Sequence, residues 1–218
     1  MTATFRLPVT LEGHWVRLVP LDARDAGALR AAARDPQIGR YMLMGPGTTP
    51  EETTDFIATI LERQRAGTDL GFTTVLRAEG RAVGMTRFLH IDRENHSVEI
   101  GGTWLDSSLW KTPVNTESKY LLLRHAFETE RVHRVSIQTD LRNERAQRAI
   151  ERLGAVREAE FRDDKLLSDG SFRTSVVYGI VASEWLTVKQ NLEAKLARPW
   201  EPPQRSTGPD RRGRDARR

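Results

Sequence analysis

Three consecutive strand-like segments, joined only by short polar turns, constrain the fold of this chain more than any other feature. They cover residues 71–78, 81–91 and 97–105, with turns at Glu79-Gly80 and around Arg93 to Asn95. Strands that follow one another through turns of this length pair as antiparallel neighbours, because a parallel pair needs a crossover connection of a dozen or more residues. The sequence therefore predicts an antiparallel meander in the middle of the chain.

Helical and strand patterns alternate on both sides of this meander. Thr49, Pro50 and Glu52 form a capping box with a first-turn proline, which predicts a helix that begins there and ends at Gly67. Ser168-Asp169-Gly170 predicts a hairpin between the last two strands. The other predicted elements are a strand at 14–21, a helix at 23–34, a helix from Asn115 to about Thr129, a strand at 133–140, a short helix from Asn143 to Gly154, strands at 156–167 and 171–182, and a helix at 183–196. This order predicts an α+β fold whose mixed, mostly antiparallel central sheet has about seven strands and is flanked by helices.

The composition excludes several classes of protein. Cysteine is absent, so a disulfide framework, a thiolate nucleophile and a sulfur-ligated metal site are excluded. The histidines are scattered without paired spacing on one helix, and we predict no metal site; they are His14, His90, His96, His125 and His133. No apolar run approaches the roughly 20 residues of a bilayer crossing, and the N-terminal residues do not resemble a secretory signal. We therefore expect a cytoplasmic, globular protein.

The net charge of +4 is concentrated at the C-terminal end. The last twenty residues, Pro199 to Arg218, contain six arginines and three acidic residues, which leaves +1 for the rest of the chain. A segment this rich in proline and arginine cannot bury enough apolar surface to become ordered. We expect an N-terminal extension at 1–10, one folded domain at 11–197 and a disordered tail at 198–218. Nucleic-acid binding would rest on this tail alone, and a solubilising role is the simpler expectation.

The segment from Val98 to Phe127 carries the most specific motif of the sequence. It contains a strand, a loop with the sequence WKTPVNTE and a leucine-rich helix, and an Asn-headed helix, NERAQRAIERLGA, follows later. Together these motifs resemble the cofactor-binding half of GNAT N-acetyltransferases of the RimJ/RimL type, and the likeness extends from Leu11 to Leu196. The resemblance implies the three-layer α/β GNAT fold, acetyl-CoA as cosubstrate and an amine as acceptor, either a protein N-terminus or a small molecule. Many members of the family are homodimers, which this sequence by itself does not establish.

The loop before the leucine-rich helix is predicted to bind the pyrophosphate of acetyl-CoA. Free N–H groups at a helix N-terminus bind anions through hydrogen bonds and the helix dipole. Lys111 adds a positive charge, and the hydroxyls of Thr112 and Thr116 can donate to phosphate oxygens. The candidate cofactor residues of this loop are Trp110, Lys111, Thr112, Val114, Asn115 and Thr116. An ordinary capped helix start is the alternative, and Pro113, which stands where the family has its central glycine, removes one N–H donor.

The resemblance implies further cofactor contacts on either side of this loop. In the family the preceding strand pairs through its backbone with the pantetheine arm, which implicates Thr103, Trp104 and Leu105, and its amides can polarise the thioester carbonyl. A packing role is the alternative for Trp104. Asn143 would hydrogen-bond the pantetheine, and it can also serve as the N-cap of its helix.

The groups that transfer protons depart from the family pattern. Ile150 replaces the tyrosine that many GNAT enzymes carry on the Asn-headed helix, and Ala146 replaces the serine of RimL-like enzymes. Glu99 is the candidate catalytic base, because it alternates with the apolar residues Val98 and Ile100 on the strand that faces the predicted cleft. A glutamate on the solvent face of the sheet is the alternative. The weaker candidates for proton transfer, each with packing as its alternative, are Tyr120, His125 and Tyr178.

Two functions are compatible with these residues. The first is an active N-acetyltransferase in which the amine attacks the thioester directly, and the second is a catalytically inactive GNAT-fold module that acts as an acyl-CoA sensor or an interaction domain. The missing acid groups and Pro113 favour the second, whereas the retained strand, loop and helix favour the first. The fold does not select an acceptor. Its binding wall is expected from residues 41–44 and from Glu158, Phe161 and Arg162.

Overall fold

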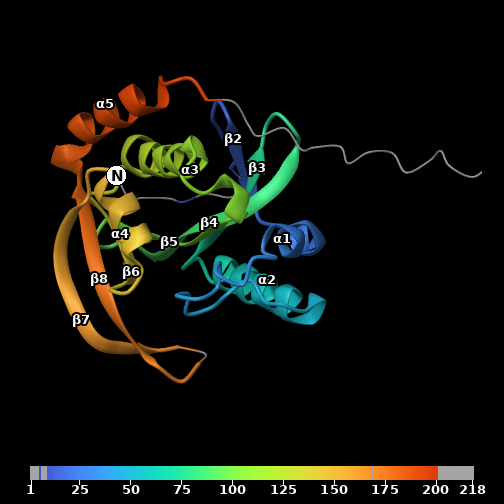
Figure 1. Cartoon of the computed structure of the whole chain (residues 1–218). Helices are drawn as coiled ribbons and strands as arrows, with labels where there is room; N and C mark the ends of the chain where they lie inside the picture. The colour runs from blue at the N-terminus through green and yellow to red at the C-terminus, as the bar shows by residue number, and fades with distance from the viewer. Residues whose placement is uncertain (1–4, 6–8, 168, 201–218) are drawn as a thin grey trace, which may run out of the picture.

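One mixed sheet organises the residues that the computed structural model describes, which are 5, 9–167 and 169–200 (Figure 1). Its eight strands are β1 (Leu11–Glu12), β2 (Val16–Pro20), β3 (Leu70–Leu76), β4 (Arg81–Asp92), β5 (Ser97–Leu105), β6 (Arg134–Asp140), β7 (Val156–Leu166) and β8 (Phe172–Val181). They lie in the order β1-β2-β3-β4-β5-β6-β8-β7, and every neighbouring pair is antiparallel except β5 with β6. The predicted fold class and the central meander, β3 to β5, are therefore confirmed.

The strand count differs from the prediction by β1. This strand has only two residues and pairs with β2 through Leu11 and Glu12. A two-residue strand is too short to show a period in the sequence, so the pattern could not reveal it.

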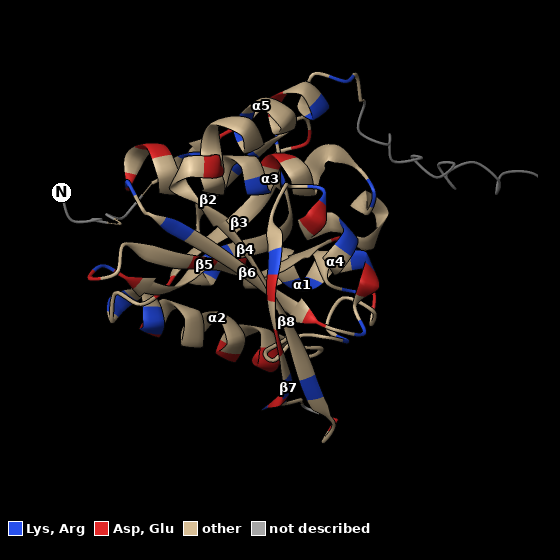
Figure 2. Cartoon of the chain, turned by 90° about the vertical axis from the view of Figure 1, so that its left-hand side faces the viewer, with Lys and Arg blue, Asp and Glu red and all other residues tan. Residues whose placement is uncertain are grey.

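Helices cover both faces of the sheet. They are α1 (Ala26–Ala32), α2 (Pro50–Arg65), α3 (Pro113–Arg124), α4 (Glu144–Glu151) and α5 (Trp185–Leu196), with short turns η1 (Ala23–Asp25), η2 (Ser107–Leu109), η3 (His125–Thr129) and η4 (Ala182–Glu184). Helices α3 and α5 lie over one face, and α1 and α2 lie over the other (Figure 1). The view in Figure 2 shows the same three layers from the side. Within the described residues, no helix has both the length and the apolar character needed to cross a membrane.

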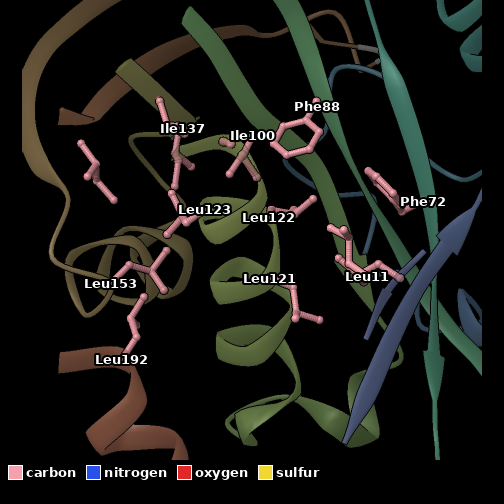
Figure 3. Packing of buried hydrophobic residues seen from close by; sticks show 14 of the residues in the cluster. Leu11, Phe72, Phe88, Ile100, Leu121, Leu122, Leu123, Ile137, Leu153 and Leu192 are labelled. Atoms are coloured by element: carbon pink, nitrogen blue, oxygen red, sulfur yellow. The ribbon is translucent and has the colours of Figure 1, made fainter. Parts of the chain in front are cut away.

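The core consists of two apolar clusters, one on each face of the sheet. Figure 3 shows the larger cluster, in which Leu121, Leu122 and Leu123 of α3 meet Phe72, Phe88 and Ile100 of the strands. The second cluster joins α1 and α2 to the opposite face and includes Ile57, Ile60, Met85 and Trp104. Complete burial of one such side chain contributes about 1.5–3 kcal/mol.

Capping residues set the helix starts. Thr49 is the N-cap of α2 and accepts a hydrogen bond from the N–H of Glu52 at 3.1 Å, while Glu52 accepts one from the N–H of Thr49, as the capping box predicts. The start predicted for α3 at Asn115 is wrong by two residues, because Thr112 is its N-cap and Pro113 its first residue. Proline suits that position, since its fixed φ is helical and a first-turn N–H has no partner within the helix.

A buried carboxylate fastens the β1–β2 turn to α3. Glu117 accepts hydrogen bonds from the backbone N–H groups of His14, Trp15 and Val16 at 2.6, 2.8 and 2.8 Å. Gly13 leaves room for this contact, because a Cβ there would lie 2.6 Å from the Glu117 carboxyl carbon. The glutamate of the VNTE motif therefore has a structural partner at the N-terminal edge of the sheet.

Most of the predicted extension and tail falls outside the description. Residues 1–4, 6–8 and 201–218, and with them the basic segment from Arg205 to Arg218, are not among the described residues, and neither is Ser168 of the predicted hairpin. On either side of Ser168, Leu167 N donates to Ser171 O at 2.8 Å, and β7 and β8 pair as an antiparallel hairpin. The domain boundaries at 11 and 197 stay a prediction.

Candidate functional site

The two halves of the sheet separate between β5 and β6. These strands pair in register only from Ser97 to Glu99 of β5, opposite Arg134 to Ser136 of β6. Beyond Glu99, the backbone of β5 has no register partner on its β6 side among the described residues. The backbone groups on that edge are therefore free to bind an extended ligand.

A bulge bends β5 at this point. Arg87 of β4 pairs with Gly101 and Met85 with Trp104, so two residues of β5 lie opposite one residue of β4. Bulges increase local twist and redirect a strand. Gly102 has a φ of 55°, and a Cβ there would lie 2.7 Å from Nε of Arg87, so the bulge requires glycine.

Glu99 lies where the two strands separate, and it is buried. The residue is 8% exposed. Its Oε2 accepts a hydrogen bond from Nε2 of Gln138 at 3.1 Å and lies 3.0 Å from Nδ1 of His90. The hydrogen bond with Glu99 is the main cause that raises the pKa of His90, against partial desolvation. The alternative of a solvent-facing glutamate is therefore excluded.

A buried lysine supports the bulge from the α3 side. Lys119 is 5% exposed, and its Nζ donates a 2.5 Å hydrogen bond to Oγ1 of Thr103, which also lies 2.7 Å from Oγ1 of Thr86. Burial lowers the pKa of Lys119 to about 7, and the attraction of Glu99 opposes this shift. Thr103, predicted as a cofactor residue, thus has its side chain held by α3 and β4, which leaves its backbone as the part available to a ligand.

Sequence reasoning missed Lys119, although a signal was present. Leu122, Leu123 and Ala126 follow it at spacings of three, four and seven residues, and all are fully buried. Residues at these spacings share one face of a helix. The stripe therefore predicts a buried lysine, an arrangement that usually requires a polar partner.

The cofactor loop forms a capped helix start with free donors. The hydroxyl of Thr112 donates to the carbonyl of Leu109 at 2.7 Å and accepts from the N–H of Val114 at 3.4 Å, so it is already engaged and does not fit the predicted role of phosphate donor. The side chain of Val114 is fully buried, which leaves only its backbone for a ligand. Asn115 is the third residue of α3, where N–H groups have no partner within the helix, whereas at Thr116, the fourth, the helical hydrogen-bond pattern begins and the hydroxyl is the candidate donor.

Lys111 and Trp110 flank this helix start. Lys111 is exposed, with a φ of 64°, and adds a positive charge beside the free N–H groups. Trp110 donates its indole N–H to the carbonyl of Leu105 at 3.1 Å, and the guanidinium of Arg145 lies 3.4 Å from the centre of its ring. This cation–π contact connects the cofactor loop to α4 across the separation of the strands.

The tryptophan and leucine at the end of β5 face opposite clusters. Trp104 packs in the cluster under α1 and α2, and its buried indole N–H has no hydrogen-bond partner among the described residues. Leu105 packs in the larger cluster. The packing role considered for Trp104 is therefore present, together with one unused donor.

Helix α4 begins as predicted. Asn143 is its N-cap, and its Oδ1 accepts a hydrogen bond from the N–H of Ala146 at 3.1 Å. Ile150 is buried in the larger cluster. Ala146 and Ile150 stand where members of the family have proton-donating side chains, and they provide only a methyl group and a buried apolar side chain.

The weaker candidates for proton transfer point away from Glu99. Tyr120 donates its hydroxyl to Glu193 of α5 at 2.6 Å, and Tyr178 donates to Glu151 of α4 at 3.1 Å. His125 packs against Phe88 in the larger cluster. Since Val98 and Ile100 belong to that cluster, strand alternation directs Glu99 to the opposite face. All three are packing residues.

The predicted acceptor wall is brought only partly to the site. Met42 and Met44 pack against the cluster that contains Trp104. Glu158 forms an ion pair with Arg134, and Phe161 and Arg162 are exposed on β7. No group of three or more histidine or acidic residues in the described part of the chain is arranged to hold a metal ion.

Comparisons with known proteins agree with this geometry. The sequence profile described as acetyltransferase (GNAT) domain matches residues 16–156. The chain is 26% identical over 151 residues to YdaF of Bacillus subtilis, a protein named provisionally as a ribosomal N-acetyltransferase, and the match covers 68% of this chain and 80% of YdaF. A crystal structure from T. thermophilus, provisionally assigned as an acetyltransferase, is 37% identical with a TM-score of 0.81 and covers 88% of this chain and 100% of its own.

A third relative was solved with a ligand. RimJ of Mycobacterium smegmatis in complex with CoA-disulfide superposes with a TM-score of 0.76 over 86% of this chain and 95% of its own. At 20% sequence identity this likeness concerns the fold alone.

Proposed function

The chain belongs to the GNAT acetyltransferase family, and we propose that within this family of acyltransferases it moves the acetyl group of acetyl-CoA to a primary amine by direct attack in a ternary complex. The observation that carries the proposal is Glu99, a buried carboxylate placed where β5 and β6 separate. Gln138 and His90 hold its Oε2, which leaves Oε1 for a substrate proton.

The residues around the separation fit the cosubstrate. The free N–H group of Asn115 and the charge of Lys111 suit a pyrophosphate at the start of α3, with the hydroxyl of Thr116 as a further candidate donor. The edge of β5 from Thr103 to Leu105 has no register partner on its β6 side among the described residues and suits an extended arm that carries amides, except at the Leu105 carbonyl, which Trp110 already occupies. We assign the arm's far side to Asn143, whose Oδ1 caps α4 and whose side-chain amide nitrogen has no hydrogen bond to any described residue.

The chemistry needs few groups. Acetyl-CoA supplies an activated acyl carbon; the amine nitrogen forms the new C–N bond, the C–S bond breaks and Glu99 takes the proton that the nitrogen loses. A thiol has an ordinary pKa of about 8.5, so the leaving group departs as a thiolate and takes a proton from water. Apolar Ala146 and Ile150 are compatible with this route. A backbone N–H at the bulge, aimed at the developing oxyanion, would contribute about 3 kcal/mol.

A thiol-release assay with acetyl-CoA and a panel of amines and peptides tests the proposal. We expect Glu99→Gln to lower kcat/KM by roughly 100-fold and to remove the basic group from the pH–rate profile, with an unchanged KM for acetyl-CoA. Glu193→Gln on α5 is the matched control, because that glutamate bonds Tyr120 and none of the residues proposed to bind the substrates.

The outcomes separate the two functions considered for this chain. An unchanged pH–rate profile in Glu99→Gln would remove Glu99 from the mechanism. Binding of acetyl-CoA in calorimetry without thiol release for any amine would favour an inactive acyl-CoA-binding module. If acetyl-CoA does not bind and no thiol is released, both functions are rejected.

A further inference from the structure

Arg173 of β8 is a largely buried residue whose guanidinium Nε has no hydrogen-bond partner among the described residues. The residue is 7% exposed, and no hydrogen bond or ion pair joins it to any residue that the structure describes. Burial lowers its pKa, although Asp140, Asp164 and Glu99 attract the charge from a distance. A buried charge that lacks a partner is strongly destabilising. Residues that break this rule are typical of sites where a ligand provides the missing group.

Arg173 lies on the same face of the sheet as Glu99. Gln138 of β6, which bonds Glu99, pairs in register with Val177 of β8. Side chains two residues apart on a strand share a face, so Ser175 and Arg173 continue the row that begins at Val177. Ser175 is fully buried, and its Oγ also lacks a hydrogen-bond partner among the described residues.

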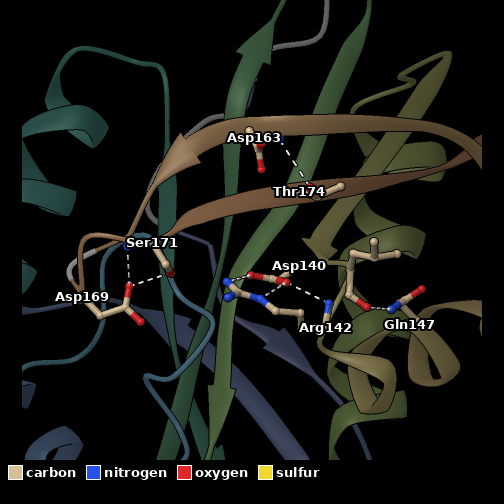
Figure 4. Close-up of polar contacts among 8 residues, drawn as sticks. Asp140, Arg142, Gln147, Asp163, Asp169, Ser171 and Thr174 are labelled. Carbon is tan, nitrogen blue, oxygen red and sulfur yellow. Dashed lines mark hydrogen bonds and ion pairs between the residues drawn. The ribbon is translucent and has the colours of Figure 1, made fainter.

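The nearest acidic residue on β6 is already neutralised. Asp140 pairs in register with Ser175, but both of its carboxylate oxygens bind Arg142, with Nη2–Oδ2 at 2.8 Å and Nε–Oδ1 at 3.0 Å (Figure 4). Asp164 lies in the irregular part of β7 where the register shifts between Phe161 and Lys165. Neither residue provides the ion pair that Arg173 lacks.

A second guanidinium with a free donor lies on the other side of Glu99. Arg87 of β4 is 7% exposed and binds Asp69 through Nη1 at 3.0 Å, while its buried Nε has no partner among the described residues. Leu89 pairs in register with Glu99, and Arg87, two residues earlier on β4, shares that face. Glu99 therefore stands between two buried cations that both have unused N–H groups.

Arg173 and Glu99 together complement a ligand that carries one negative and one positive group. We propose that Arg173 binds an anionic group of the acceptor, so that the acceptor is a primary amine that also carries a carboxylate. The amine then lies at Glu99 and the carboxylate at Arg173. This inference rests on the proposed acetyltransferase function and specifies its substrate class.

Paired acceptors test this substrate class directly. Glycine, β-alanine and 4-aminobutyrate are each compared with the corresponding amide in the thiol-release assay, and peptides with an N-terminal Asp or Glu are compared with Asn or Gln peptides. We expect the carboxylate form of at least one pair to have a kcat/KM roughly 10- to 100-fold higher, as for a charge-assisted hydrogen bond. A preference for the carboxylate among the amino acids indicates a free amino acid as the acceptor. A preference among the peptides indicates an acidic peptide N-terminus.

Variants locate the preference at Arg173. In Arg173→Gln the ratio of kcat/KM for the carboxylate to kcat/KM for the amide should fall to near one, while the rate with neutral amides is kept. Arg173→Lys should restore part of this ratio. Arg157→Gln, which removes an exposed arginine of the same hairpin, is the control. Because Arg173 has no hydrogen bond or ion pair with any described residue, Arg173→Gln should not lower the urea midpoint, whereas replacing an arginine that stabilises the fold would.

The outcomes keep this inference apart from the proposed function. Equal rates for acids and amides in the wild type, or a preference that survives in Arg173→Gln, would overturn the inference and leave the acetyltransferase function standing. Calorimetry of the same amino acids without acetyl-CoA gives a readout that does not depend on turnover. If the wild type binds the amino acids and Arg173→Gln does not, the subsite is supported even without acetyl transfer. If the wild type does not bind them and Arg173→Gln has a lowered urea midpoint, Arg173 serves stability alone.

Discussion

Replacing the buried Lys119 by methionine should stabilise the protein most near neutral pH. The side chain lies under the bulge of β5 with one hydrogen-bond acceptor, Oγ1 of Thr103, and its pKa falls from 10.5 to about 7 because of burial. Methionine has a similar length and no charge to desolvate. Thr103 keeps Thr86 as a hydrogen-bond partner in the variant.

The sign and size of the effect follow from proton linkage. Below pH 7 the Lys119 ammonium is charged in both the folded and the unfolded state, so the folded state is destabilised by the full free energy of burying the charge. Above pH 10.5 the amine is neutral in both states, and this destabilisation disappears. Between these values the unfolded chain binds more protons, so the free energy of unfolding rises with pH. The shift from 10.5 to about 7 corresponds to on the order of 5 kcal/mol in full, of which about 3 kcal/mol falls between pH 7 and pH 9.5.

Urea unfolding of the wild type and of Lys119→Met at several pH values between 7 and 9.5 measures this effect. Subtracting the two stability curves cancels the titrating groups that do not interact with Lys119, and the advantage of the variant should shrink by about 3 kcal/mol as the pH rises. Lys189→Met is the control: Glu128 raises the pKa of that partly exposed lysine, so its contribution changes only above this window. Parallel curves for the wild type and Lys119→Met would refute the depressed pKa.

Three further changes test other contacts. Glu117→Ala removes the acceptor of three backbone N–H groups and should cost about 3 kcal/mol in urea unfolding; a loss below about 1 kcal/mol would contradict the anchoring role. Asn143→Ala should cost about 1 kcal/mol as a lost N-cap, and an unchanged affinity for acetyl-CoA would end its proposed second role. Arg145→Gln should change the fluorescence of Trp110 and weaken acetyl-CoA binding in calorimetry; an unaltered spectrum would contradict the stacked contact.

The sequence was sufficient for most of the fold, because local chemistry specifies most of its elements. Thr49 with Glu52 and the cap at Asn143 set two helix starts through short-range hydrogen bonds. The start of α3 was misplaced because both Thr112 and Asn115 can cap a helix, and only the backbone shows which one does. β1 was missed because its two residues are too few to show the period of a strand.

The site was less predictable, because it depends on which face each strand presents. Alternation with Val98 and Ile100 was enough to propose Glu99, but not to decide whether its face is buried. Lys119 and Arg173 escaped notice because lysine and arginine side chains are ordinarily solvent-exposed, although the stripe that Lys119 shares with Leu122 and Leu123 indicated burial. Their significance comes from what surrounds them, which requires the register of β5, β6 and β8.

The outermost strand, β7, has a bearing on solubility. It ends the sheet beside β8, so one row of its backbone groups is open to another chain. Seven of its eleven residues are charged, with both signs interspersed (Figure 2), and a register shift interrupts it between Phe161 and Lys165. Charges and irregularities of this kind prevent the edge of a sheet from recruiting further strands. Replacing these charged residues by neutral ones would therefore allow the edge of β7 to pair with strands of other molecules and promote aggregation.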